Sequence, residues 1–135
     1  MAAYNKFNTF VGDLAAKVHN LGSDQLAVAL TDTLPVSTNT VIANITQISY
    51  TNLSSRNITL TSSGQTSGTY TLKLTNLTLT ASGTVPQFRY IVIYNSTASG
   101  GPLISWFDNG SEVNMGSGDT YLVNFDATNG LLQLT

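Results

Sequence analysis

The sequence predicts a mainly β protein, an antiparallel β-sandwich or jelly roll of seven to eight strands that follows an N-terminal amphipathic α-helix. Three patterns indicate this fold class. Apolar residues alternate with Thr or Ser through most of the chain after residue 56. Short runs rich in Gly, Asn and Asp separate the alternating segments, at the spacing typical of sandwiches. Between residues 4 and 21, apolar residues recur every three or four positions.

We expect the N-terminal helix to occupy residues 1–22. Its apolar positions are Tyr4, Phe7, Val11, Leu14, Val18 and Leu21. Gly22 follows the last of them, where a glycine readily adopts the left-handed conformation that ends a helix. His19 lies in the last turn, where we expect a capping or surface group. The face of Tyr4, Phe7, Val11 and Leu14 either packs on the β-domain or docks a partner.

Residues 25–135 are expected to form the sandwich, within one domain of residues 1–135, the usual size for a single core. The first strand lies within residues 24–31, where Leu26, Val28 and Leu30 alternate with smaller residues. Near residues 39–48 two interpretations stay open. The apolar spacing favours a short helix of one or two turns, capped by Thr38 or Asn39, and the β-branched residues favour a strand.

Further strands are predicted from the alternation after residue 56. Their ranges are 57–63, 69–82, 87–95, 102–108, 120–126 and 130–135. We expect a hairpin loop over residues 64–68, a bulge at Asn76 and loops over residues 96–101, 109–119 and 127–130. Residues 88–94 are apolar on both faces of a strand, which is typical of a central strand covered on both sides.

Charge and cysteine content exclude several function classes. The net charge is -2 and the five basic residues are scattered singly, so we expect no nucleic-acid partner. No segment approaches the ~20 apolar residues that cross a bilayer, so we expect no membrane partner and synthesis in a cytoplasm. Without cysteine there is no disulfide or thiolate chemistry.

Ser, Thr and Asn fill 47 positions, and such a neutral surface suits close packing in an assembly.

No enzyme is predicted: we expect no catalytic residues, no cofactor and no metal. His19 is the single imidazole, and no serine or cysteine motif accompanies it. Asp108, Glu112 and Asp119 could supply oxygen ligands to calcium from one glycine-rich loop. Their spacing matches no calcium loop, and turns are rich in Asp for backbone reasons, so the turn interpretation is favoured.

Aromatic residues offer an alternative, a sugar-stacking platform of a carbohydrate-binding module. Its candidates are Tyr90, Tyr94, Trp106, Phe107 and Tyr121. The two-faced apolar pattern of residues 88–94 favours core positions for these rings instead.

Several segments together resemble small structural proteins of tailed bacteriophages, in particular head decoration or cement proteins. They are YNKFNTFVGDLAAKVHNLGSDQLAVALT, LPVSTNTVIANI, QTSGTYTLKL, PQFRYIVIYN, GPLISWFDNGS and FDATNGLLQL, and they span nearly the whole chain. The resemblance implies a non-enzymatic virion protein that is synthesised in the cytoplasm of a host bacterium. On the capsid surface, such a protein binds and stabilises the lattice of the major capsid protein. It also implies association with copies of itself, as a dimer or trimer. A tail, baseplate or receptor-binding, carbohydrate-binding component remains the alternative.

Two kinds of surface are candidates for the partner contacts of such a protein. One is the N-terminal helix, and the other is the polar loop after residue 95 together with the end of the strand at residue 108. The candidate contact residues are Tyr4, Phe7, Val11, Leu14, Ser96, Thr97, Ser99, Asp108 and Asn109.

Overall fold

The computed structural model describes residues 4–135, and in this range the protein is mainly β. The main sheet is antiparallel and contains, in spatial order, β1 (Tyr4–Lys6), β7 (Leu103–Met115), β6 (Val85–Asn95) and β2 (Leu26–Thr31). A second antiparallel sheet contains β3 (Leu60–Thr66), β4 (Thr69–Leu74) and β9 (Leu132–Leu134). A third pairs β5 (Leu77–Thr80) with β8 (Thr120–Val123). The predicted fold class is thus confirmed as mainly β with several antiparallel sheets.

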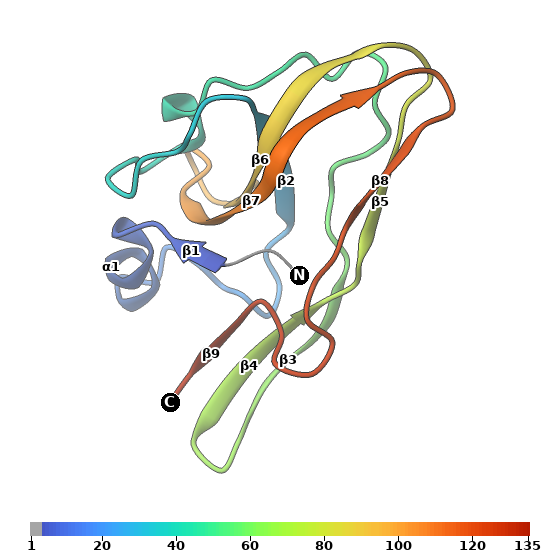
Figure 1. Ribbon diagram of the computed structural model, residues 1–135. Coiled ribbons are helices and arrows are strands. Elements are labelled where there is room, and N and C mark those ends of the chain that lie inside the picture. Colours follow the sequence, from blue (N-terminus) through green and yellow to red (C-terminus); the bar gives the residue numbers. More distant parts are fainter. Residues whose placement is uncertain (1–3) are drawn as a thin grey trace.

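The strand pairs are nested around the loop of residues 96–101. Strands β4, β5 and β6 follow one another along the chain, and β7, β8 and β9 return beside them in reverse order. The pairs β6–β7, β5–β8 and β4–β9 therefore form one long two-stranded ribbon, which bends between the sheets (Figure 1). Backbone bonds hold the bend, including Ala81 N to Asp119 O at 2.9 Å.

The main sheet is buried on both faces. One face contributes Ile91, Ile93 and Ile104 to the larger apolar cluster, which also contains residues of β4, β5, β8 and β9. The other face contributes Val92 and Leu103 to a smaller cluster with Phe7. Each large side chain that is buried in this way contributes about 1.5–3 kcal/mol relative to an exposed one. This explains the central position of β6, as its two apolar faces predict.

The N-terminal helix is present, but the predicted range of residues 1–22 is wrong. Tyr4–Lys6 form β1, because their backbone pairs with Ser105–Phe107 of β7. The helix, α1, covers only Thr9–Ala15. Residues 1–3 of the predicted range lie outside the described residues. None of the helices within residues 4–135 is long and apolar enough to cross a bilayer.

Lys17, and not Gly22, ends α1. It has a left-handed backbone with φ of 70°. Lys17 N bonds to Leu14 O at 3.3 Å and Val18 N bonds to Asp13 O at 2.9 Å, the two bonds of a Schellman motif. The chain then leaves the helix axis, so Val18 and Leu21 do not continue the apolar stripe that their spacing predicts.

Three other elements differ from the sequence-based expectations. Near residues 39–48 the chain forms a single 3-10 turn, Ile42–Asn44, in which the Asn44 side chain accepts a bond from Val41 N at 3.2 Å. The predicted strand at 69–82 is two strands, β4 and β5, which lie in different sheets. The predicted loop at 109–119 is mostly strand, because β7 continues to pair with β6 up to the pair Val85 and Met115. The predicted hairpin is confirmed, but its loop is shorter than residues 64–68. Residues 64–66 belong to β3, and Ser67 and Gly68, both at positive φ, form the turn.

Gly130 and Gly12 provide a matched pair of stability predictions. Gly130 has φ of 76°, and a Cβ there would overlap the carbonyl oxygen of Leu72. We expect Gly130→Ala to lower the free energy of unfolding by at least about 2 kcal/mol. Gly12 lies inside α1 with nothing within 4 Å of a built Cβ. Gly12→Ala should raise the free energy of unfolding by about 0.5–1 kcal/mol. Urea unfolding measures both, and equal effects of the two changes would contradict this account.

Candidate functional site

A bulge in β7 forms the candidate site. Tyr90 of β6 pairs with Asp108 of β7, and Phe88 pairs with Val113. Residues 109–112 therefore stand opposite Arg89 alone, and β7 makes an excursion away from the ladder. Bulges of this kind redirect side chains and occur often beside functional sites. We call residues 108–112 with Arg89 the β7 bulge.

Side chains of the bulge bond to its own backbone. Gly110 has φ of 90°, which favours glycine, and its N–H donates to Asp108 Oδ1 at 2.8 Å. Asn109 Nδ2 donates to Ser111 O at 2.9 Å. These bonds replace the ladder bonds that the excursion interrupts, so the bulge keeps a defined shape.

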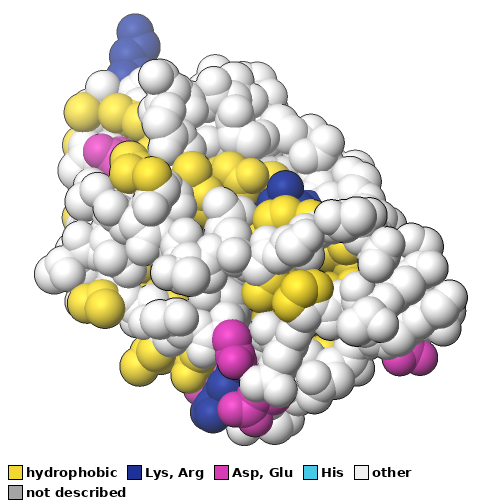
Figure 2. Space-filling model, turned by 90° about the horizontal axis from the view of Figure 1, so that it is seen from above, with side chains coloured by type: hydrophobic (Ala, Val, Ile, Leu, Met, Phe, Trp, Pro, Cys, Tyr) yellow, Lys and Arg dark blue, Asp and Glu magenta, His cyan; other side chains and the backbone are white. Residues whose placement is uncertain are grey.

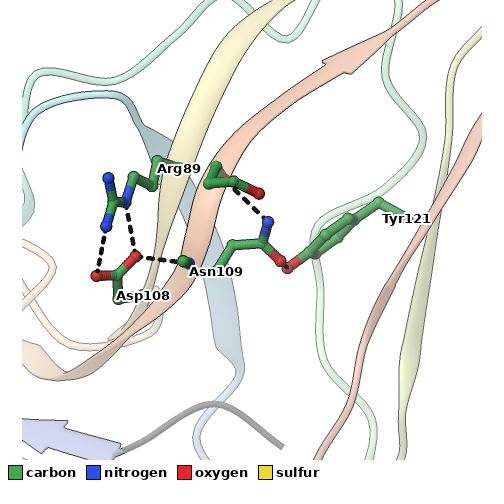
Figure 3. A network of polar contacts seen from close by, with 6 residues as sticks. Arg89, Asp108, Asn109 and Tyr121 are labelled. Carbon is green, nitrogen blue, oxygen red and sulfur yellow. Dashed lines mark hydrogen bonds and ion pairs between the residues drawn. The ribbon is translucent and has the colours of Figure 1, made fainter.

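Arg89 and Asp108 form a two-pronged ion pair across the bulge (Figure 3). Arg89 Nε lies 2.8 Å from Asp108 Oδ1, and Arg89 Nη2 lies 3.2 Å from Oδ2. No other ion pair occurs within residues 4–135. The bond from Arg89, followed by the bond from Gly110, lowers the pKa of Asp108. Because both side chains are solvated, the pair contributes more to orientation than to stability.

Tyr121 connects the bulge to β8. Its hydroxyl donates to Asn109 Oδ1 at 2.8 Å, across the opening between β7 and β8 (Figure 3). Its ring meets Phe88 edge to face, with ring centres 5.4 Å apart. Burial raises the pKa of the Tyr121 phenol above its usual value, so the hydroxyl remains a donor at neutral pH.

A cleft of about 300 Å³ opens between the β7 bulge and β8. Its buried lining residues are Ile91, Phe107 and Val123, which belong to the larger apolar cluster. Its accessible lining includes the half-buried Tyr121 and the exposed Asn109 and Asn124. The remaining lining residues are Asp108, which is paired with Arg89, and Leu122, which is 52% exposed. The site thus combines a buried apolar floor with a rim of polar groups and one exposed leucine.

Two of the sequence-based candidates, Asp108 and Asn109, lie in this site, and three others lie in the loop of residues 96–101. Ser96 Oγ donates to Gln25 O at 2.9 Å, and Thr97 Oγ1 accepts from Gln25 N at 2.8 Å. Ser99 is exposed. The loop is therefore ordered, but it does not join the cleft lining.

The four candidates at the N-terminus do not share one helix face. Tyr4 lies in β1 with its ring 6.3 Å from that of Phe107. Phe7 is fully buried, with its ring 4.7 Å from that of Trp106. Val11 is 51% exposed and Leu14 is half-buried. Among these four, Val11 and Leu14 are the helical positions that a partner can reach, and Phe7 is a core residue.

His19 is not the capping or surface group that its position in the sequence predicts. It is 5% exposed, and its Nδ1 lies 3.1 Å from Asn95 Nδ2. Asn95 Nδ2 also donates to Asp24 Oδ2 at 2.6 Å. Burial lowers the pKa of His19, and the negative charges of Asp13 and Asp24 oppose part of this shift. The adjacent Phe10 ring, centred 5.3 Å away, is consistent with a structural role.

The alternative aromatic platform, which the sequence pattern disfavoured, does not form as one surface. Tyr90 and Phe107 are buried, and Trp106 packs against Phe7 with the smaller cluster. The acidic residues of the 108–119 segment do not gather either: within residues 4–135 no group of three His, Cys, Asp or Glu side chains could hold a metal ion. Asp119 instead accepts a bond from Gly116 N at 2.8 Å in the turn after β7.

Comparison with family models, with curated proteins and with solved structures gives no significant match for this chain.

The ion pair predicts a measurable titration of Asp108. We expect its pKa to lie below the usual ~3.9 for an aspartate, and Arg89→Gln to raise it towards that value. Gly110 N still donates in the variant, so part of the shift should remain. Side-chain carbonyl shifts in NMR titrations measure this pKa. Asp126, whose pKa is lowered by bonds from Asn129 and Thr128, is the internal control and should not change. If the pKa of Asp108 were the same in Arg89→Gln as in the wild type, the role of Arg89 would be contradicted.

The buried imidazole predicts a loss of stability in mild acid. Because the folded state lowers the pKa of His19, the unfolded chain binds the proton more tightly. The free energy of unfolding should therefore fall as the pH drops below about 6.5. His19→Gln should abolish this dependence between about pH 7.5 and 5. The fall at lower pH should persist in the variant, because Asp108 and Asp126 titrate there. An identical pH profile in the two proteins would refute the assignment.

Proposed function

We propose that this protein is a non-enzymatic structural component of a tailed-phage virion, a capsid decoration or cement protein. It binds the lattice of the major capsid protein and copies of itself, as a dimer or trimer, on the outer surface of the shell. Its mechanism is additive burial of surface at many equivalent positions, without a cofactor. The sequence resemblance to head decoration proteins suggests this role, and one structural observation supports it.

That observation is the exposure of large apolar side chains on α1, directly after α1, and in the loop that bonds to the start of α1. Val11 and Val18 are 51% and 38% exposed, on α1 and directly after it. Leu34 and Val36 are 60% and 55% exposed, in the loop after β2. The bond from Asn8 N to Ser37 O, 2.9 Å long, holds this loop against the start of α1. We call these four residues the α1-end surface.

Exposed large apolar side chains that are concentrated in a few neighbouring segments often mark protein contacts. Seven large hydrophobic residues are exposed within residues 4–135, and the α1-end surface contains four of them. A patch of this size gives modest affinity in one copy. On a symmetric lattice, however, many simultaneous contacts convert modest affinity into firm attachment.

The rest of the surface suits neighbours in close array. White polar and backbone atoms cover most of the face in Figure 2, where hydrophobic side chains form separate patches and charged side chains are few. Only 9% of the residues are charged, so adjacent copies repel one another weakly. The ordered loop of Ser96, Thr97 and Ser99 offers hydroxyl groups for such contacts.

We also propose that the three sheets form a single-domain jelly-roll sandwich over residues 1–135. Two observations support this finer assignment. The nested pairs form one folded ribbon, which is the way in which a jelly roll is built. In addition, residues of β4, β5, β8 and β9 share the larger apolar cluster with the main sheet.

Particle binding tests the proposed function. Added to particles of its own phage, the purified protein should give repeated density on the capsid surface by cryo-electron microscopy. Val11→Asp places a charge on the α1-end surface and should weaken particle binding at least tenfold, since a desolvated unpaired charge costs more than about 1.4 kcal/mol.

Leu60→Asp is the matched control. Leu60 is 38% exposed in β3 and is not one of the four residues of the α1-end surface, so its change should leave particle binding unaltered. Circular dichroism checks that both variants fold. Density on the tail or baseplate would replace the decoration proposal with the tail alternative, and absence of density from the particle would reject both.

A further inference from the structure

We infer that the cleft between the β7 bulge and β8 binds one neutral sugar ring, either free or at the end of a glycan. This inference goes beyond lattice attachment and does not depend on it. The cleft and the α1-end surface are formed by different residues, so a sugar ligand and a capsid partner could be tested separately.

The size and floor of the cleft suit a ring with one apolar face. Its volume of about 300 Å³ lies at the lower end of the range for small-molecule sites. The floor of Ile91, Phe107 and Val123 is apolar and belongs to the core, so it is rigid. A pyranose presents C–H groups on its faces and hydroxyl groups around its perimeter. The floor residues are at most 4% exposed, whereas Leu122, also in the lining, is 52% exposed. The face of the ring can pack on this apolar lining while its hydroxyls meet the polar groups of the rim.

The rim supplies hydrogen-bonding groups of both kinds. An Asn side chain has a carbonyl acceptor and two N–H donors, which matches hydroxyl groups that both donate and accept. Asn124 is exposed, and its amide makes no hydrogen bond within the described part of the chain. The Tyr121 hydroxyl donates a hydrogen bond to Asn109 Oδ1, and its oxygen still has lone pairs that can accept a bond from a sugar hydroxyl.

Two of the rim residues, Asn109 and Tyr121, are oriented before any ligand binds. Asn109 is held at both ends, by Ser111 O at 2.9 Å and by the Tyr121 hydroxyl at 2.8 Å. The Tyr121 ring is itself held against Phe88. Groups that are ordered before binding lose little entropy when a ligand binds, so even a small polar ligand can bind with measurable affinity.

Charge at the cleft favours a neutral ligand. Arg89 and Asp108 neutralise each other through two bonds, so neither is available as a lone charge for an anion or a cation. The other rim groups, Asn109, Tyr121 and Asn124, are uncharged at neutral pH. A phosphate or carboxylate would find no unpaired cation in the lining, whereas hydroxyl groups would find amides and a phenol.

Protein-observed NMR tests the inference on the full chain. Free glucose, galactose, mannose and N-acetylglucosamine are each titrated to millimolar concentration, and a glycan array extends the panel to attached sugars. We expect at least one sugar to shift the amide signals of Gly110, Tyr121 and Asn124 together. A signal for the attached form alone would identify a glycan end as the ligand, and a signal for both would identify the ring itself.

Two variants separate the ligand contacts from the fold. Asn124→Ala removes an exposed amide that holds nothing in the protein, and Tyr121→Phe keeps the ring on Phe88 but removes the hydroxyl. Each should weaken sugar binding about five- to tenfold, the effect of one lost hydrogen bond. Asn114→Ala changes an exposed asparagine of β7 that lies outside the cleft lining, and this variant should bind like the wild type.

Three outcomes would overturn the inference: no shift with any sugar and no array signal, shifts that map away from the cleft, or wild-type binding by Asn124→Ala and Tyr121→Phe together. None of these would bear on particle binding through Val11. Failure of the particle experiment would equally leave a measured sugar titration intact.

Discussion

Burial of β6 on both faces is the constraint on which the rest of the structure depends. Its residues alternate between two apolar clusters, so elements on each side must cover it. On one side these are the other parts of the folded ribbon. On the other side Phe7 and Ile45 cover Val92, which places the N-terminal segment and the 3-10 turn region against the main sheet. The N-terminal segment is therefore part of the core and not an appended arm.

The end of β6 organises the polar connections around that core. Asn95 is fully buried, and its Oδ1 accepts bonds from Thr97 N and Ala98 N at 3.0 and 3.1 Å. Its Nδ2 lies within bonding distance of both His19 and Asp24. One amide thus orders the loop after β6 and fastens the segment after α1. A buried amide that is satisfied in this way specifies a unique arrangement, because any shift leaves a polar group unpaired.

Local patterns predicted the elements whose structure depends on local chemistry. The two-faced pattern of residues 88–94 predicted the central strand, and Ser67–Gly68 lies within the predicted hairpin loop. Errors arose where distant pairing decides the outcome. Tyr4 and Phe7 fit a helical stripe, yet pairing with β7, about a hundred residues later, makes Tyr4 part of a strand. Residues 69–82 alternate without a clear break, and only their separate partners, β9 and β8, divide them between two sheets.

In the candidate site, too, local features were predictable from the sequence and contacts between distant residues were not. Asp108 and Asn109 were identifiable as polar residues at the end of an apolar strand, and both lie in the bulge. Their partners were not identifiable, because Arg89 and Tyr121 reach them from neighbouring strands. The run Asn109, Gly110 and Ser111 has the composition of a turn, and the positive φ of Gly110 is indeed turn-like. The strand continues because Val113 and Met115 find partners in β6, which no local signal indicates.

The nested ribbon has a consequence for the order in which the chain can fold. Closing the loop of residues 96–101 brings β6 and β7 together at little entropic cost. Once β6 and β7 are paired, the ends of β5 and β8 are already close, so the free chain that must be closed to pair them is shorter than their separation in the sequence. We expect assembly to proceed outward from that loop, through β5–β8 to β4–β9. Sheets with such distant pairings fold slowly compared with helical proteins. Until β9 is synthesised and docks, β4 presents an unpaired edge to other chains, and rapid production at high concentration would expose this protein to aggregation along that strand.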